Sequence, residues 1–105
     1  MKLQPSLKQK KRYVLFEIKS KERFTASEVK KEVDSALLLF IGQLGLSKAS
    51  PLFLKERFKD NQFMVKINHK HVDECVSAIM LIKTIKSKPV LIRSIITSGT
   101  LKKAS

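Results

Sequence analysis

The tetrapeptide Thr25-Ala-Ser-Glu28 constrains the fold of this chain more than any other local feature. A threonine followed three residues later by a glutamate forms a capping box, in which each side chain accepts a hydrogen bond from the other residue's backbone amide. A helix is therefore expected to begin here. Gly42 and Gly45 are expected to weaken and end it after roughly 18 residues. Its buried stripe is predicted from apolar residues spaced by three and four, namely Val29, Val33, Ala36, Leu37, Phe40, Ile41 and Leu44.

The segments around this helix favour strands. Residues 13–18 are rich in β-branched and aromatic side chains and have no helix cap, which predicts a first strand. Residues 51–58 and 63–67 alternate apolar and polar side chains on either side of the turn-forming residues 60–62, so a hairpin is expected. Residues 90–96 predict a last strand.

A second helix is predicted between the last two strands. Asn68 can cap it, and Asp73 and Glu74 lie in its first turn, where the helix dipole favours anions. Residues 86–89 contain a proline and are expected to end it. The residues expected to be buried by this helix are Val72, Cys75, Val76, Ile79, Met80 and Ile82.

The predicted order βαββαβ defines an α+β fold, the ferredoxin-like or split βαβ arrangement. Right-handed crossovers would give a four-stranded antiparallel sheet of order 4-1-3-2 with two helices on one face. A swapped dimer of the same elements stays open. The domain is expected to span residues 12–101, between a basic leader (1–11) and a short basic tail (102–105).

Alternation along the strands predicts which side chains face the helices. That face should carry Val14, Phe16, Ile18, Leu54, Phe63, Val65, Ile67, Ile92 and Ile96. The opposite face should carry Tyr13, Leu15, Phe53, Met64, Lys66, Leu91, Arg93 and Ile95. Apart from Lys66, we expect this second set to meet a protein partner, because it is too apolar to be left in water. A covering segment of the chain itself, or a register error of one residue in a strand, is an equally open alternative.

The formal net charge is +13, which favours a polyanionic partner. Neither residues 1–16 nor residues 75–105 contain an acidic side chain. The predicted topology brings many of these cations to one end of the sheet, whereas residues 83–88 should lie toward the opposite end. The candidate RNA-binding residues are Lys8, Lys10, Lys11, Arg12, Lys48, His69, Lys70, His71, Lys102 and Lys103. The alternative is a solubilising leader with no binding role.

Several classes of protein are unsupported by the sequence. The longest apolar run, residues 36–41, is far shorter than the roughly 20 residues of a membrane span, and no secretion signal is evident. A single cysteine, Cys75, fits a reducing cytoplasm. His69, His71 and Cys75 lack the second pair of ligands that structural zinc needs. No nucleophile motif, phosphate-binding glycine loop or acylphosphatase-type loop is present, so no catalytic residue and no metal site are predicted.

Three motifs in order resemble one family. They are residues 11–18 (KRYVLFEI), residues 42–51 (GQLG leading into KASP) and residues 98–102 (SGTLK). Together they resemble the small ferredoxin-like protein subunits of archaeal and eukaryotic ribonuclease P, whose archaeal members are called protein component 2. The similarity extends over nearly the whole chain through the order and spacing of these motifs.

The resemblance implies an accessory subunit of the RNA-based endonuclease that removes the 5′ leader of precursor tRNA. Its implied partners are the ribonuclease P RNA, precursor tRNA and a larger barrel-shaped protein subunit, component 3, while self-association stays open. The catalytic component would be RNA, with Mg²⁺ on the RNA and no cofactor on this chain. The alternative is a generic basic RNA-binding or ribosome-associated domain. An RNA recognition motif is disfavoured, because Met64 and Lys66 occupy positions where stacking aromatics would be needed.

Overall fold

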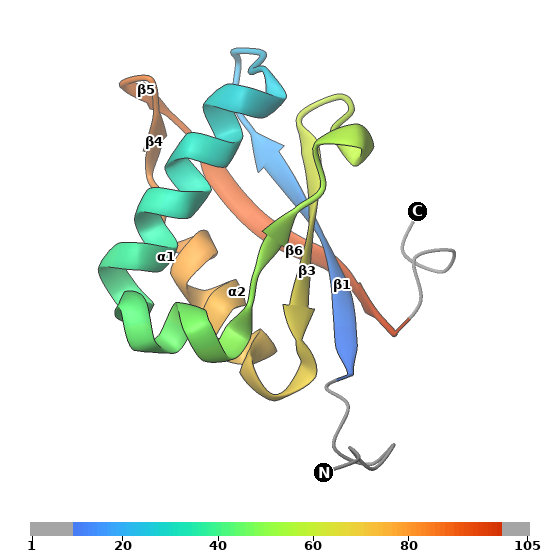
Figure 1. Cartoon of the computed structure of the whole chain (residues 1–105). Coiled ribbons are helices and arrows are strands. Elements are labelled where there is room, and N and C mark those ends of the chain that lie inside the picture. Colours follow the sequence, from blue (N-terminus) through green and yellow to red (C-terminus); the bar gives the residue numbers. More distant parts are fainter. Residues whose placement is uncertain (1–9, 100–105) are drawn as a thin grey trace, which may run out of the picture.

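A computed structural model describes residues 10–99 and shows a sheet with two helices on one face (Figure 1). The elements in chain order are β1 (Lys11–Lys19), α1 (Ala26–Ala49), β2 (Leu52–Phe53), the 3₁₀ turn η2 (Lys55–Arg57), β3 (Gln62–Asn68), the 3₁₀ turn η3 (His69–His71), α2 (Val72–Met80), β4 (Thr84–Ile85), β5 (Lys88–Pro89) and β6 (Leu91–Ser98). The main sheet is antiparallel and has the order β2-β3-β1-β6, which confirms the predicted ferredoxin-like topology. Among the described residues, no helix combines the length and apolarity needed to cross a membrane.

The capping box at the start of α1 is confirmed. The Thr25 amide donates to the Glu28 carboxylate at 2.9 Å, and the Glu28 amide donates to the Thr25 hydroxyl at 3.3 Å. The predicted end of the helix is wrong. Gly42 does interrupt it, with φ 80° and ψ 173°, but helical structure resumes and continues to Ala49. The stop is Ser50, which adopts the left-handed conformation and donates its backbone N–H to the Leu46 carbonyl at 2.8 Å.

The strand predicted over residues 51–58 is also wrong beyond Phe53. After β2 the Leu54 amide donates to the Met64 carbonyl at 2.9 Å, and the chain then turns into η2. Phe53 pairs with Val65 and stacks on Phe63 in the core, at a centroid distance of 5.5 Å, so it does not face a partner. Leu54 packs against Met64 on the other face of the sheet, contrary to its expected core position. The expected facing is therefore reversed at these two residues.

A β-bulge changes the facing of β6. Leu15 is opposite Ile96 whereas Phe16 is opposite Ser94, which leaves Ile95 as the additional residue. Beyond the bulge, Ile96 shares the helix-free face with Leu15 and is 39% exposed, so its expected place in the core is wrong. Ile92, before the bulge, is buried as expected.

The second helix begins later and ends earlier than predicted. Asn68 caps η3, and α2 starts only at Val72. Met80 is 39% exposed rather than buried, because α2 ends there. The helix is followed by an unpredicted hairpin of β4 and β5, whose turn residues Lys86 and Ser87 both have positive φ, as a type I′ turn requires.

Candidate functional site

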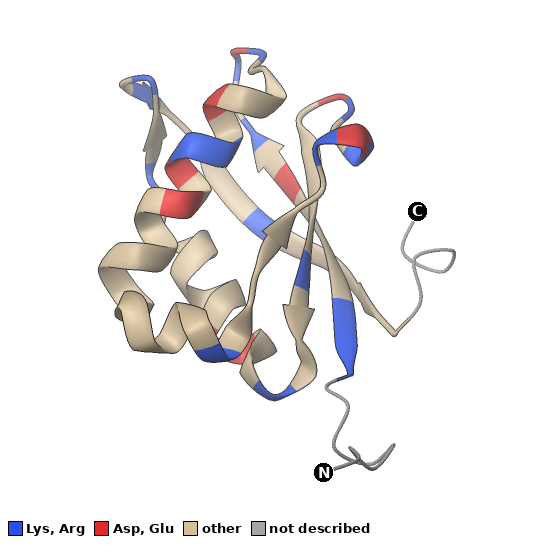
Figure 2. Ribbon diagram, viewed as in Figure 1, with Lys and Arg blue, Asp and Glu red and all other residues tan. Residues whose placement is uncertain are grey.

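Basic side chains gather at the end of the sheet where β1 begins and β3 ends (Figure 2). Lys11 is opposite Asn68, and the His69 amide donates to the Lys10 carbonyl at 2.8 Å. We call this surface the basic end. Its described members are Lys10, Lys11, Arg12, Lys48, His69, Lys70 and His71. The predicted members Lys8, Lys102 and Lys103 lie outside the described residues.

Asn68 connects the segments that form the basic end. Its side chain is only 3% exposed. The side-chain carbonyl accepts from the Lys70 amide at 3.0 Å, and the side-chain amide donates to the Lys48 carbonyl at 3.4 Å. One buried residue thus connects the last strand residue, η3 and the end of α1. The sequence predicted a cap at this position, but the contact with Lys48 depends on the continuation of α1 past Gly45, which the sequence did not predict.

The Lys and Arg residues of the basic end make no ion pair among the described residues, although Asp73 and Glu74 follow in the first turn of α2. In residues 10–99, ion pairs involve Lys or Arg elsewhere, and within the basic end only His71 is near an acid, with Nδ1 at 3.5 Å from Glu74 Oε1. The pKa of His69 is lowered by partial burial and by the nearby cations Arg12, Lys70 and Lys10. Burial is the larger cause, and the three cations that add to it are also the groups that would attract a phosphate.

The opposite end of the molecule is different. There, the Lys86 ammonium lies 2.6 Å from the Glu28 carboxylate, and Arg23 lies 3.4 Å from Asp60. Figure 2 shows acidic and basic segments intermixed around this end. The pKa of Glu28 is lowered, chiefly by its hydrogen bond with Lys86. These ion pairs neutralise cations at this end, and so they increase the charge asymmetry that the sequence predicted between the two ends.

The helix-free face is less accessible than predicted. Met64 is only 1% exposed, because Leu54 covers it and Tyr13 and Leu15 pack beside it. With Phe53 in the core, two of the seven residues proposed for a protein-binding face are unavailable. Arg93 is exposed and forms an ion pair with Glu17, with Arg93 Nε 3.3 Å from Glu17 Oε1. Leu52 on β2 stays open on this face, at 49% exposure. The other open apolar residues are on β6 and are named the β6 strip: Leu91, Ile95 and Ile96, at 56%, 44% and 39% exposure.

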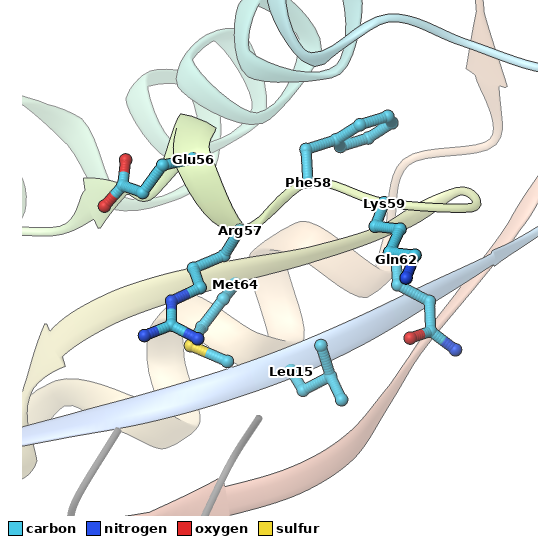
Figure 3. A pocket seen from close by; sticks show the side chains of 7 residues that line it. All are labelled: Leu15, Glu56, Arg57, Phe58, Lys59, Gln62 and Met64. Atoms are coloured by element: carbon cyan, nitrogen blue, oxygen red, sulfur yellow. The ribbon is translucent and has the colours of Figure 1, made fainter. Parts of the chain in front are cut away.

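The same face contains a pocket of about 380 Å³ between η2 and the strands β1 and β3 (Figure 3). We call it the sheet pocket. Its lining residues are Leu15, Glu56, Arg57, Phe58, Lys59, Gln62 and Met64. The pocket was not predicted from the sequence, since it exists only because residues 55–57 form a turn instead of continuing β2.

Comparison with known proteins assigns the family. Residues 12–105 match the model of the Rpp14/Pop5 family. The chain belongs to this family. It is 37% identical over 101 residues to "Ribonuclease P protein component 2" of Pyrococcus abyssi, covering 96% of this chain and 86% of that protein. The protein of the same name from Methanocaldococcus jannaschii is 34% identical over 102 residues, covering 97% and 75%. The predicted family resemblance is confirmed.

A solved structure has the same fold as this chain. A chain in the cryo-EM structure of yeast Ribonuclease MRP superposes with a TM-score of 0.67 at 17% sequence identity, covering 89% of this chain and 76% of that one. The βαββαβ core is therefore shared at low sequence similarity.

No group of three or more His, Cys, Asp or Glu side chains in residues 10–99 is placed to hold a metal ion. Cys75 is fully buried, and burial together with the Glu74 carboxylate raises the pKa of its thiol to about 11. Its contacts are those of a small core residue.

Proposed function

We propose that this chain is an accessory protein subunit of ribonuclease P, the RNA-based endonuclease that removes the 5′ leader of precursor tRNA. The observation that carries the proposal is the family match over residues 12–105, together with archaeal relatives named ribonuclease P protein component 2. The hydrolytic chemistry would belong to the RNA, with Mg²⁺ held by RNA phosphates. This chain would contribute binding and no catalytic residue, in a cytoplasmic particle where its thiol stays reduced.

The basic end supplies a physical mechanism for that role. Folded RNA brings phosphates close together, and their repulsion opposes the compact fold. Cations that make no ion pair within residues 10–99, such as Lys10, Lys11, Arg12 and Lys70, can neutralise phosphates and release condensed counterions. Binding of this kind would stabilise the folded RNA and reduce the Mg²⁺ concentration that it needs.

The β6 strip is the surface we assign to the barrel-shaped protein subunit, component 3. β6 is an edge strand of the sheet, and it exposes the apolar side chains Leu91, Ile95 and Ile96, with the Arg93–Glu17 ion pair between Leu91 and Ile95. Apolar side chains beside an unpaired strand edge favour association with another protein. Association of two copies of this chain through the same strip is the competing outcome.

Reconstitution tests the proposed function directly. Cleavage of precursor tRNA is measured with the RNA and the barrel-shaped subunit, in the presence and absence of this chain. We expect the chain to raise the cleavage rate or to lower the Mg²⁺ requirement. RNA binding without either effect would favour the generic RNA-binding alternative and would reject the proposal.

A matched pair of variants tests the basic end. Neutralising Lys10, Lys11 and Arg12 to glutamine should lower the slope of log affinity against log salt by about 2–3, since each phosphate contact contributes about 0.7–0.9. The control neutralises three exposed lysines elsewhere, Lys31, Lys83 and Lys88, and removes the same net charge. Equal slopes for the two triple variants would show that total charge, not the basic end, determines binding.

A further inference from the structure

The sheet pocket has an apolar floor. Met64 from β3 and Leu15 from β1 are directly paired across the two strands, and both line the pocket. A volume of about 380 Å³ is near the lower limit for small-molecule sites, which span roughly 300–1,000 Å³. The pocket thus suits one flat ring system better than a peptide strand or a helix.

The rim of the pocket is cationic. Arg57 and Lys59 are exposed, and neither makes an ion pair within the part of the chain that the structure describes. In Figure 3 the Arg57 side chain lies beside Met64, whereas the Glu56 carboxylate is directed away from the floor. The amide of Gln62 stands on the other side of the mouth. Such an amide can both donate and accept hydrogen bonds.

Charge distinguishes between two kinds of occupant. Arginine is common both at protein interfaces and at sites that bind a base and its phosphate, whereas lysine is depleted at protein interfaces. Lys59 at the rim therefore favours the nucleotide. The next residue of β3 on the same face is another lysine, Lys66, opposite Tyr13. Beyond Tyr13, β1 continues to Lys11 at the basic end. A row of cations therefore connects the sheet pocket with the basic end, about 13 Å away along β3.

We propose that the sheet pocket binds a single unpaired nucleotide of RNA. The base lies against the Leu15 side chain, next to the buried Met64. The Arg57 guanidinium stacks on the nucleotide or donates hydrogen bonds to it. The Gln62 amide forms hydrogen bonds with the base edge. Lys66 contacts the phosphates next to the bound nucleotide, on the side that faces the basic end. This site rests on the proposed RNA-binding function and extends it.

The site differs from the stacking platform of an RNA recognition motif. That platform uses aromatic side chains on an open sheet. Here the residues expected to stack are replaced by Met64 and Lys66, and the turn η2 supplies a wall that encloses the base from one side. One base held in a pocket needs no aromatic platform, so the arguments against extended base stacking still hold.

The experiment compares two RNA hairpins with the full chain. One carries a single bulged 2-aminopurine nucleotide, and the other carries an abasic ribose at the same bulge. We expect the base-containing hairpin to bind at least about fivefold more tightly, given the usual contribution of one stacked base. Its 2-aminopurine emission should also change on binding. Arg57→Ala should bring the affinity ratio close to one, as should Gln62→Ala.

Lys55→Ala is the matched control, because Lys55 is an exposed cation of the same turn that does not line the pocket. It should retain the preference for the base. Circular dichroism verifies folding, and if Arg57→Ala does not fold, Gln62→Ala decides. Equal binding of both hairpins by the wild-type chain, or equal loss of the preference in Lys55→Ala, overturns the pocket proposal while leaving RNA binding intact. Binding of neither hairpin at low salt overturns both proposals.

A protein occupant would give another result. Arg57→Ala would then leave the hairpin preference unchanged and would weaken binding of the barrel-shaped subunit. That outcome overturns the nucleotide site and assigns the pocket to the protein partner.

Discussion

Replacement of Asn68 by alanine tests how the basic end is built. The substitution removes the hydrogen bond to the Lys70 amide at 3.0 Å and the longer one to the Lys48 carbonyl at 3.4 Å. Losing a capping side chain costs about 1 kcal/mol, and a buried polar group left without a partner costs about 1–3 kcal/mol. The contact with Lys48 is long, so its loss belongs at the low end of that range.

We therefore expect Asn68→Ala to lower the free energy of unfolding by about 2 kcal/mol. For a domain of this size each kcal/mol shifts the melting temperature by roughly 4–8 °C, so the expected decrease is about 10 °C. Thermal and urea denaturation followed by circular dichroism would measure both quantities. A decrease of less than about 0.5 kcal/mol would show that the two hydrogen bonds contribute little.

The same substitution should weaken RNA binding at temperatures where the variant is folded. Without Asn68, the end of α1 is no longer connected to η3, so Lys48, His69 and Lys70 lose their common placement. We expect the salt slope of RNA affinity to decrease by about 1–2, which corresponds to one or two phosphate contacts.

Asn61 provides a matched control at the other end of β3. Its side chain is also buried, donates to the Glu22 carbonyl at 2.8 Å and accepts from the Phe24 amide at 3.1 Å. Asn61→Ala should destabilise the fold at least as much, since Asn61 also has a positive φ of 58° that alanine disfavours. Its salt slope for an RNA without an unpaired nucleotide should remain unchanged, because Asn61 lies far from the basic end. Parallel loss of RNA binding in both variants would attribute the effect to general destabilisation and refute the reasoning.

Three further predictions concern the helix break and two titrating groups. Gly42→Ala should destabilise the fold by about 1–2 kcal/mol in urea denaturation, because the Gly42 φ of 80° is strained for any other residue. Gly45→Ala should also destabilise the fold, since the added Cβ would overlap the Ile41 side chain. His69 has a lowered pKa, so its contribution to stability is present above the ordinary histidine pKa and is lost as the pH falls below it. NMR titration should show the pKa of His69 rising when RNA phosphate binds nearby. An unchanged pKa would show that RNA binds elsewhere on the protein. The thiol of Cys75, with a pKa of about 11, should react with a disulfide reagent at pH 8 far more slowly than a free thiol, and rapid reaction would contradict its burial.

The elements that the sequence predicted correctly depend on local chemistry. The capping box at Thr25 fixes where α1 begins, and the β-branched run in β1 fixes the central strand. Antiparallel pairing of β1 with β3 then places Lys11 next to Asn68. The basic end follows from topology alone, because it needs only the order of the strands and the positions of the cations along them.

The incorrect predictions for the strands share one cause, which is competition between alternation and tertiary hydrogen bonds. Residues 52–58 alternate well enough for a strand, but the Leu54 amide pairs with Met64 and the Arg57 amide turns back to the Leu54 carbonyl at 3.0 Å. In β6 an additional residue at Ile95 reverses the facing of Ile96. Neither event leaves a distinctive pattern in the sequence, since both depend on the partner strand.

These two irregularities divide the helix-free face into chemically different halves. The turn η2 covers Met64 and leaves a pocket with Arg57 at its rim, so the half over β3 is cationic and concave. The bulge adds Ile96 to the outer surface of β6, so the other half is apolar and ends at an unpaired strand edge. A regular four-stranded sheet would expose one mixed surface to one partner. With both irregularities present, the sites that we propose for RNA and for a protein partner lie on the same face and share no residue.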